Sequence, residues 1–216
     1  QIHAEKILQS SKKYGTSIPW LIMTSRANHE DTVRYLASRR YFGLDERDVY
    51  IFPQSMIPSL DAGGRLILES PSAIFKNPDG HGGSLGALAE SGTLAAMRER
   101  GIEIISYFQV DNPLVSIIDP VFIGFHEQGG ADISSKGLMK AYPSEKIGVF
   151  VRFDDGTIGV VEYSDLPEHL QNLRDTDGRL RFCMGSIAIH LFSVDFLEKI
   201  TGGSALSLPF HIARKK

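Results

Sequence analysis

The sequence has 216 residues, enough for one large domain or for part of a larger one. It is 42% hydrophobic and 23% charged, and its net charge of −3 and isoelectric point of about 6.2 exclude the strongly basic surface of a nucleic-acid binder. No apolar run is long enough for a membrane span, and a single cysteine, Cys183, excludes an internal disulfide. We therefore expect a cytoplasmic protein that binds neither nucleic acid nor a membrane.

The first half of the chain alternates apolar runs with amphipathic segments. After an amphipathic N-terminal helix, Ile18–Thr24 is an apolar run typical of a buried parallel strand. Asn28 is suited to cap the next helix, whose apolar side includes Phe42. A strand over Val49–Phe52 and a hairpin over Leu60–Leu68 follow.

The second half continues the alternation. It predicts one long helix over Leu85–Arg100, a helix that begins at Pro120, and a β-hairpin that turns at Asp155-Gly156. The remaining predicted elements are strands over Ile102–Val110 and Arg181–Ser193 and helices over Leu166–Leu173 and Val194–Ile200. Because strands alternate with helices, the predicted fold is a layered α/β protein with a mainly parallel sheet and inserted β-hairpins.

The densest group of turn residues is NPDGHGGSLGAL, Asn77–Leu88. Glycines let backbone N–H groups approach a ligand, and the start of the following helix favours an anion, so Gly80–Gly83 suits a phosphate or the edge of a base. The segment lacks the ending of a Walker loop and the glycine spacing of dinucleotide-binding folds. Pattern alone favours an ordinary turn, with His81 as an exposed loop histidine.

Two carboxylates follow predicted strands, where ligands bind in open α/β sheets. Asp111 can hold Mg²⁺ beside phosphate oxygens or can instead cap the turn of its own "DNP" segment. Glu162 can accept hydrogen bonds from sugar hydroxyls, although a solvated charge is the more common outcome at a strand end. The sequence has no zinc-ligand spacing and no Gly-x-Ser-x-Gly elbow.

Taken together, these segments resemble the UDP-sugar pyrophosphorylases, and most closely their UDP-N-acetylglucosamine branch. The segments that carry the resemblance are "MTS" (Met23–Ser25), "FPQSMIPSL" (Phe52–Leu60), "NPDGHGGSLGAL", "VDNPLVSIIDPVFIGF" (Val110–Phe125), "KAYPSEKIGV" (Lys140–Val149), "VVEYSDLP" (Val160–Pro167), "GSIAIHLF" (Gly185–Phe192) and "HIARKK" (His211–Lys216). They cover nearly the whole chain, and the combination of "VDN…DPVFIGF" with "VEYS" is the most specific part.

The resemblance implies a Rossmann-like nucleotidyltransferase core that joins UTP to a sugar 1-phosphate, giving a UDP-sugar and pyrophosphate. By matching position, Gln54 and Gly80 are expected to contact the uracil, and His81 to lie near the sugar nucleotide. Asp111 corresponds to the catalytic Mg²⁺ ligand beside the α-phosphate.

The resemblance also assigns the sugar-binding edge, to Glu162 and the Gly185-Ser186 segment. An oxygen of the sugar phosphate attacks the α-phosphorus of UTP in line, and pyrophosphate leaves. Because the attacking phosphate is already ionised at neutral pH, no protein nucleophile is needed, and positioning and charge neutralisation carry the reaction.

Three departures from the family pattern affect these expectations. The glycine-rich loop that holds the triphosphate would precede Gln1, and a strand that contacts the sugar phosphate would follow Lys216, so we expect residues 1–216 to be the central part of one catalytic domain, truncated at both ends and inactive alone. A processed or tagged chain explains such ends equally well. Ser186 replaces a family asparagine, and His81 stands where N-acetylglucosamine enzymes often have asparagine and UDP-glucose relatives histidine.

The choice of sugar therefore stays open between N-acetylglucosamine 1-phosphate, the leading expectation, and glucose 1-phosphate or a broad range. A non-catalytic module that binds nucleotide sugars is a further alternative. The sequence leaves the oligomeric state unknown.

Overall fold

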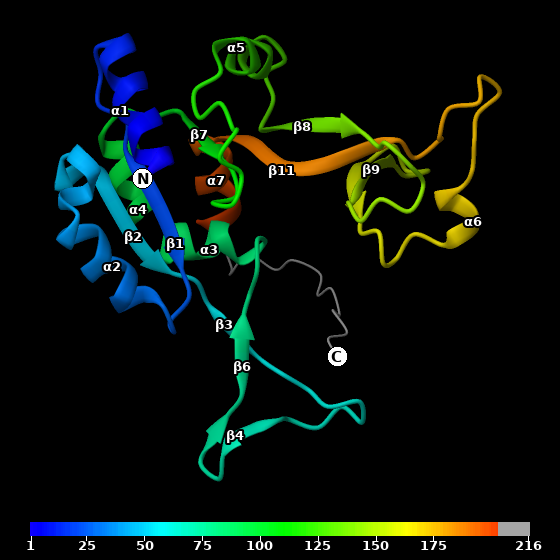
Figure 1. Cartoon of the computed structure of the whole chain (residues 1–216), viewed down its shortest axis with the longest axis horizontal. Coiled ribbons are helices and arrows are strands. Elements are labelled where there is room, and N and C mark those ends of the chain that lie inside the picture. The colour runs from blue at the N-terminus through cyan, green and yellow to red at the C-terminus, as the bar shows by residue number, and fades with distance from the viewer. Residues whose placement is uncertain (203–216) are drawn as a thin grey trace. The chain divides into compact units, whose positions relative to one another are not determined.

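The computed structural model of the protein describes residues 1–202, so the "HIARKK" segment lies outside the part that is described. The chain divides into two compact units. Of the described residues, the first unit comprises Gln1–Glu103 and residues 194–202, and the second comprises Ile104–Ser193. Figure 1 shows the elements of both units. That residues 1–216 form one catalytic domain stays a prediction.

Two parallel strands form the first unit's sheet. β1 (Trp20–Thr24) pairs with β2 (Val49–Pro53), from Trp20 opposite Val49 to Thr24 opposite Pro53. Parallel neighbours need a crossover connection, and α2 (His29–Ser38) lies within it. The unit's other helices are α1 (Ile2–Tyr14), α3 (Gly83–Glu90), α4 (Thr93–Glu99) and α7 (Val194–Thr201), with short 3-10 helices at Arg40–Gly43 and Glu46–Asp48.

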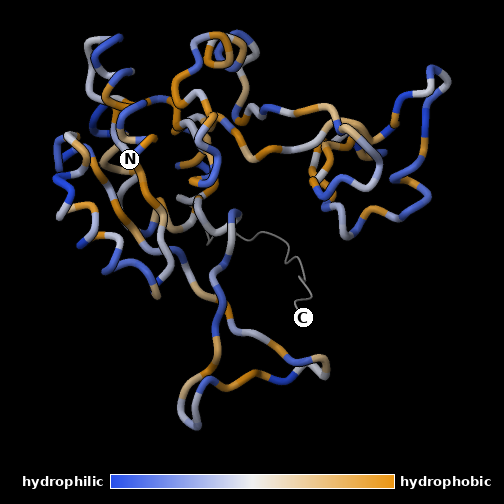
Figure 2. Tube along the Cα trace, in the orientation of Figure 1, coloured by the Kyte–Doolittle hydropathy of each residue, from blue (hydrophilic) through white to orange (hydrophobic). Residues whose placement is uncertain are grey.

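Apolar side chains from the helices make the core of this unit. Ile7, Met97 and Leu197 are each 1% exposed. The apolar centre of β1 is orange in Figure 2. At the surface, Arg98 of α4 bonds to Glu198 of α7 at 2.6 Å, which raises the pKa of Arg98 further above its ordinary value and ties the two helices together.

A β-arm extends from the first unit between β2 and α3 (Figure 1). β3 (Met56–Pro58) pairs antiparallel with β6 (Lys76–Pro78), and β4 (Leu68–Ser70) with β5 (Ala73–Ile74). The predicted turn is confirmed, since the Gly64 N–H donates to the Asp61 carbonyl at 3.0 Å. The arm brings the end of β6 back beside the residues that follow β2.

The second unit is an antiparallel sheet with β11 at its centre. Its strands are β7 (Ile104–Tyr107), β8 (Ile133–Met139), β9 (Val149–Arg152), β10 (Ile158–Val161) and β11 (Met184–Ser193), and its helices are α5 (Pro120–Gln128) and α6 (Glu168–Gln171). β11 pairs with β7, β8 and β9, and β9 pairs with β10. The predicted hairpin turn is confirmed, with Gly156 at a φ of 85°.

The prediction of a mainly parallel sheet is wrong for residues 1–202. β1 with β2 is the parallel pairing, and the other strand pairs in this range are antiparallel. The prediction took each strand–helix alternation as a parallel crossover and missed β8. Because β8 lies between α5 and the β9–β10 hairpin, that part of the chain returns by antiparallel pairing to β11. The observed class is a mixed α/β fold.

Three local predictions are also wrong. The single helix expected over Leu85–Arg100 is two helices, because Gly92 adopts a left-handed φ of 74° and ends the first. Asn28 does not cap α2 with its side chain, since its Oδ1 accepts from the backbone N–H of Ser25 at 2.8 Å. Phe42 lies beyond α2, in a 3-10 turn with a φ of 53°.

Candidate functional site

Gln54 and Gly80 lie together in the first unit. The backbone N–H of Gly80 donates to Oε1 of Gln54 at 3.1 Å. Gln54 directly follows β2, and Gly80 follows β6, so the β-arm between them closes a loop of the chain at this point. The hydrogen bond brings the two residues to one place, and their contact with the uracil stays a prediction.

The glycine loop has a defined geometry. Gly80 has a φ of 81°, and a Cβ there would meet nothing within 4 Å, so its backbone is open to a ligand. The carbonyl of His81 accepts from both the N–H and the Oγ of the buried Ser84, at 3.2 and 2.6 Å, which anchors the loop to the start of α3. The carboxylate of Asp79 packs on the Cα of Gly83 and leaves no space for a side chain there. These contacts fix the conformation of the loop, and the His81 side chain lies at its surface.

Asp111 lies in the second unit on an exposed turn that follows β7. The turn is held by its neighbours: the N–H of Asn112 donates to the Gln109 carbonyl at 3.2 Å, and Oδ1 of Asn112 accepts from the N–H of Leu114 at 3.1 Å. Asn112, and not Asp111, is thus the residue whose side chain caps the "DNP" turn. Asp111 itself is exposed, and it lies four residues beyond the end of β7, because the strand predicted over Ile102–Val110 ends at Tyr107.

In the second unit, Glu162 and Ser186 both lie next to Gly148. The N–H of Ser186 donates to the carbonyl of Gly148 at 2.8 Å. A Cβ placed on Gly148 would lie 3.2 Å from Oε1 of Glu162 and 2.8 Å from Cγ1 of Val160. Gly148 therefore lets the Glu162 carboxylate lie flat against the backbone beside β11. The exposed Glu162 side chain and Ser186 form one polar edge.

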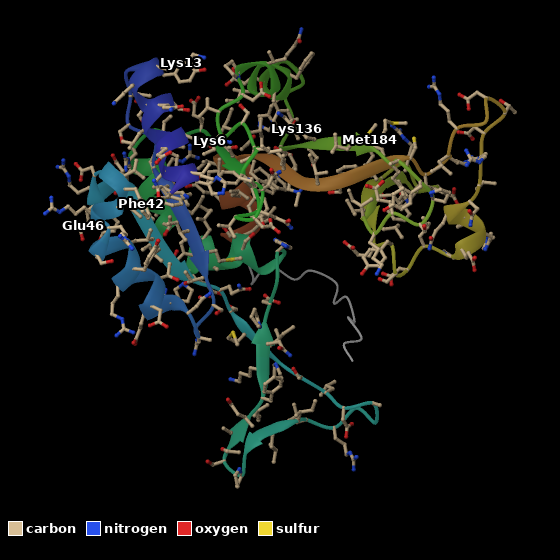
Figure 3. All side chains as sticks on the ribbon, in the orientation of Figure 1. Lys6, Lys13, Phe42, Glu46, Lys136 and Met184 are labelled. Atoms are coloured by element: carbon tan, nitrogen blue, oxygen red, sulfur yellow. The ribbon has the colours of Figure 1, made fainter. Side chains whose placement is uncertain are left out.

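Gly185 continues this edge under tight packing. It is buried opposite Val149, and a Cβ there would lie 2.8 Å from Cδ1 and 3.1 Å from Cγ2 of Ile147. Met184, labelled in Figure 3, begins the same strand. Only glycine at this position lets β11 approach the segment before β9 so closely.

A bulge in β11 follows directly. The register against β8 shifts between Ser186 and Ile189, and Ala188 has a left-handed φ of 52°. A non-glycine residue in this region is strained, and bulges commonly redirect the side chains next to binding sites. Sequence reasoning missed both this bulge and the role of Gly148. The "KIGV" segment was a usable signal for Gly148, but nothing in "GSIAI" marks the bulge.

The carboxylate of Asp111 is suited to Mg²⁺ that is bound mainly by the phosphates of a substrate. Among residues 1–202, no group of three or more His, Cys, Asp or Glu side chains could hold a metal ion. Mg²⁺ commonly takes one or two protein carboxylates and completes its shell with phosphate oxygens and water. An exposed carboxylate such as Asp111 suits that role. In the same part of the chain, no helix is long and apolar enough to cross a membrane.

Within this mixed α/β fold, the first unit carries the glycine loop beside Gln54, and the second unit carries an exposed carboxylate after β7 and a polar edge at β11. The chain belongs to the UTP–glucose-1-phosphate uridylyltransferase family, whose model matches residues 1–216. UDP-N-acetylglucosamine diphosphorylase 2 from Arabidopsis thaliana is 37% identical over 229 residues, covering 100% of this chain and 46% of the relative. UDP-N-acetylhexosamine pyrophosphorylase-like protein 1 from Xenopus tropicalis is 39% identical, covering 100% and 43%.

Solved structures show the same likeness. The UDP-N-acetylglucosamine pyrophosphorylase from Trypanosoma brucei, in complex with an inhibitor, superposes with a TM-score of 0.81 at 32% identity, over 92% of this chain and 41% of that one. A UDP-glucose pyrophosphorylase from Leishmania major has a TM-score of 0.64 at 18% identity, over 93% of this chain and 44% of that one, and shows the shared fold alone. The chain spans about half the length of the curated relatives it matches.

Proposed function

We propose that the protein is a Mg²⁺-dependent uridylyltransferase that joins UTP and a sugar 1-phosphate to give a UDP-sugar and pyrophosphate. The observation that carries this proposal is the pairing of Gln54 Oε1 with the Gly80 N–H, in a chain of this family. The pair supplies one acceptor and one donor side by side.

The acceptor–donor pair matches the edge of uracil. Uracil presents a carbonyl oxygen, O4, beside an N3–H donor, so the Gly80 N–H can donate to O4 while Gln54 Oε1 accepts from N3–H. Cytosine presents an amino donor and a bare N3 acceptor at these positions, which opposes both groups. In the free protein the Gly80 N–H donates to Oε1 of Gln54, and when the base binds, this single proton passes to O4 while Oε1 accepts from N3–H instead.

The polar edge of the second unit suits a sugar. Glu162 offers carboxylate oxygens to sugar hydroxyls, and Ser186 adds a hydroxyl that can donate or accept. Ser186 lies next to the bulge of β11, which turns this part of the strand away from regular pairing. We propose that these residues and Gly185 contact the sugar of the sugar nucleotide.

Asp111 is the residue that would hold Mg²⁺ on the α-phosphate side of the nucleotide. Bound there, Mg²⁺ supplies neutralisation of the negative charge that gathers on the phosphates during transfer. The exposed carboxylate on the turn after β7 leaves room for a phosphate and water to complete the metal's shell. The protein's own part in the reaction is to orient the two substrates.

We propose N-acetylglucosamine 1-phosphate as the preferred sugar phosphate, because the relatives compared above carry UDP-N-acetylglucosamine or UDP-N-acetylhexosamine in their names. Ser186 and His81 argue for a tolerance of glucose 1-phosphate as well. We further propose that both units belong to one Rossmann-like catalytic domain, which the parallel β1–α2–β2 arrangement supports, and that the enzyme works in the cytoplasm, as a lone cysteine suggests.

Asp111→Ala in the full-length protein separates an enzyme from a module that only binds nucleotide sugars. The variant should lower kcat for UDP-sugar formation by at least about a hundredfold, because metal charge neutralisation is lost. Its affinity for UDP-N-acetylglucosamine without Mg²⁺, measured by calorimetry, should stay near that of the wild type. A wild-type protein that binds the UDP-sugar but shows no turnover would support the binding module instead.

A further inference from the structure

Thr24 connects the end of β1 to the segment that carries Gln54. Its carbonyl accepts from the N–H of Gln54 at 2.7 Å, and its Oγ1 lies 3.2 Å from the carbonyl of Phe52. The Thr24 and Phe52 residues are each 5% exposed, so these contacts are inside the first unit. Thr24 thus holds the backbone of the Phe52–Gln54 segment at both its ends.

His29 makes the third contact of this group. It is the first residue of α2, and its Nδ1 lies 2.8 Å from Oγ1 of Thr24. His29 is five residues from Thr24 in sequence, and the turn between β1 and α2 folds it back onto the strand end. The group therefore links α2, β1 and the residues after β2.

One arrangement of the protons makes both contacts of the Thr24 hydroxyl hydrogen bonds. A threonine hydroxyl has one proton, and the Phe52 carbonyl can only accept, so Thr24 donates to Phe52. The remaining contact of the hydroxyl must then be as an acceptor, and His29 donates from Nδ1. In that arrangement Nδ1 of His29 carries a proton, and its bond to Thr24 orients the ring.

We propose that His29 and Thr24 are positioning residues for base recognition, and that they hold Gln54 beside the Gly80 N–H, where its Oε1 accepts from the N3–H of the uracil of UTP. The inference rests on the proposed function, because it assigns the contacts of Gln54 to the uracil. The chain of contacts runs from His29 through Thr24 to the backbone of Gln54, and from the Gln54 side chain to Gly80. A shift of the Gln54 backbone moves the acceptor away from the base, while the sugar and metal contacts of the second unit are untouched.

Thr24→Val in the full-length protein tests this inference. The valine keeps the shape and removes the hydroxyl, so KM and Kd for UTP should each rise about tenfold, with kcat and the KM for the sugar 1-phosphate within about threefold of the wild type. Thr24→Ser keeps the hydroxyl and should restore the wild-type values. His29→Leu should weaken UTP binding in the same way, and His29→Asn, whose Nδ2 can donate from nearly the same place, should largely restore it.

Thr32→Val is the matched control. Thr32 bonds to the Asn28 carbonyl at 2.7 Å within α2 and has no contact in the group around Gln54, so losing its hydroxyl should leave the UTP parameters unchanged. If Thr24→Val does not fold, the part-exposed His29 gives the same test. Unchanged UTP affinity in Thr24→Val and His29→Leu, with a wild type that turns over UTP, would contradict this inference alone. A wild type that neither binds nor turns over UTP would contradict the proposed function as well.

Discussion

Gln54 is the residue on which base selection depends in this account. Gln54→Ala removes the acceptor for N3–H but leaves the Gly80 N–H in place. We expect kcat/KM for UTP to fall by about ten- to a hundredfold. The preference for UTP over CTP should narrow, because the variant no longer has the Gln54 oxygen that opposes N3 of cytosine. Initial rates with UTP and CTP, measured for both proteins, check this. An unchanged preference would show that Gln54 does not read the base.

Gly185 tests the tight packing of the proposed sugar-binding edge. Gly185→Ala puts a methyl group 2.8 Å from Cδ1 and 3.1 Å from Cγ2 of Ile147, so it should lower the free energy of unfolding by about 1–3 kcal/mol. Gly124→Ala is the matched control, because a Cβ in the exposed middle of α5 meets nothing within 4 Å. That variant should be neutral or more stable by about 0.5–1 kcal/mol. Urea unfolding of both measures the difference, and equal effects would contradict the packing argument.

Among the elements, α5 depends on one carboxylate at its start. Asp119 caps the helix by accepting from the N–H groups of Val121 and Phe122 at 3.1 and 3.3 Å, and its Oδ2 meets the ammonium of Lys136 on β8 at 2.5 Å. Lys136 is labelled in Figure 3. The hydrogen bond from Lys136, followed by those from the backbone, holds the pKa of Asp119 below its ordinary value of 3.8. The charged form of Asp119 therefore stabilises the folded state.

This lowered pKa predicts a loss of stability in acid. The stabilisation is complete above the unfolded pKa of Asp119 and is lost as the pH falls through the lower pKa of the folded state. Asp119→Asn keeps a capping group but has no charge to lose, so the difference in free energy of unfolding between wild type and variant should be constant above about pH 5 and shrink below about pH 4. Denaturant unfolding from pH 7 to 3 measures it, and a constant difference over that range would contradict the role of Lys136.

The starts of helices and the turns of hairpins were predicted correctly where a few adjacent residues mark them. Pro120 after Asp119 marked the start of α5, and Asp155-Gly156 marked the hairpin turn, because caps and turns depend on a few adjacent residues. Gly92 was a local signal too, but a glycine inside an apolar periodic run is compatible with a continuous helix. The left-handed φ of Gly92, which separates α3 from α4, is seen only in the folded chain. β8 was missed because "ISSKGLM" is a polar strand whose partner, β11, lies about fifty residues further on.

At the scale of the molecule, strand pairing is the part that the sequence did not predict. Alternation of strands and helices indicated an α/β protein correctly, but the direction of each strand depends on contacts between distant segments. The same holds for the candidate site, whose residues could be predicted but whose contacts could not. Gln54 and Gly80 could be matched by family resemblance, whereas the hydrogen bond between them, the Gly148 contact of Glu162 and the bulge at Ala188 depend on the folded chain.

The central claim, that this chain is part of a uridylyltransferase, is tested most directly by pyrophosphate release from the full-length protein with UTP, Mg²⁺ and N-acetylglucosamine 1-phosphate or glucose 1-phosphate. The account predicts turnover that requires both UTP and a sugar 1-phosphate, is faster with N-acetylglucosamine 1-phosphate, and stops when Mg²⁺ is chelated. No pyrophosphate release with either sugar phosphate, by a folded protein with saturating UTP and Mg²⁺, would contradict it.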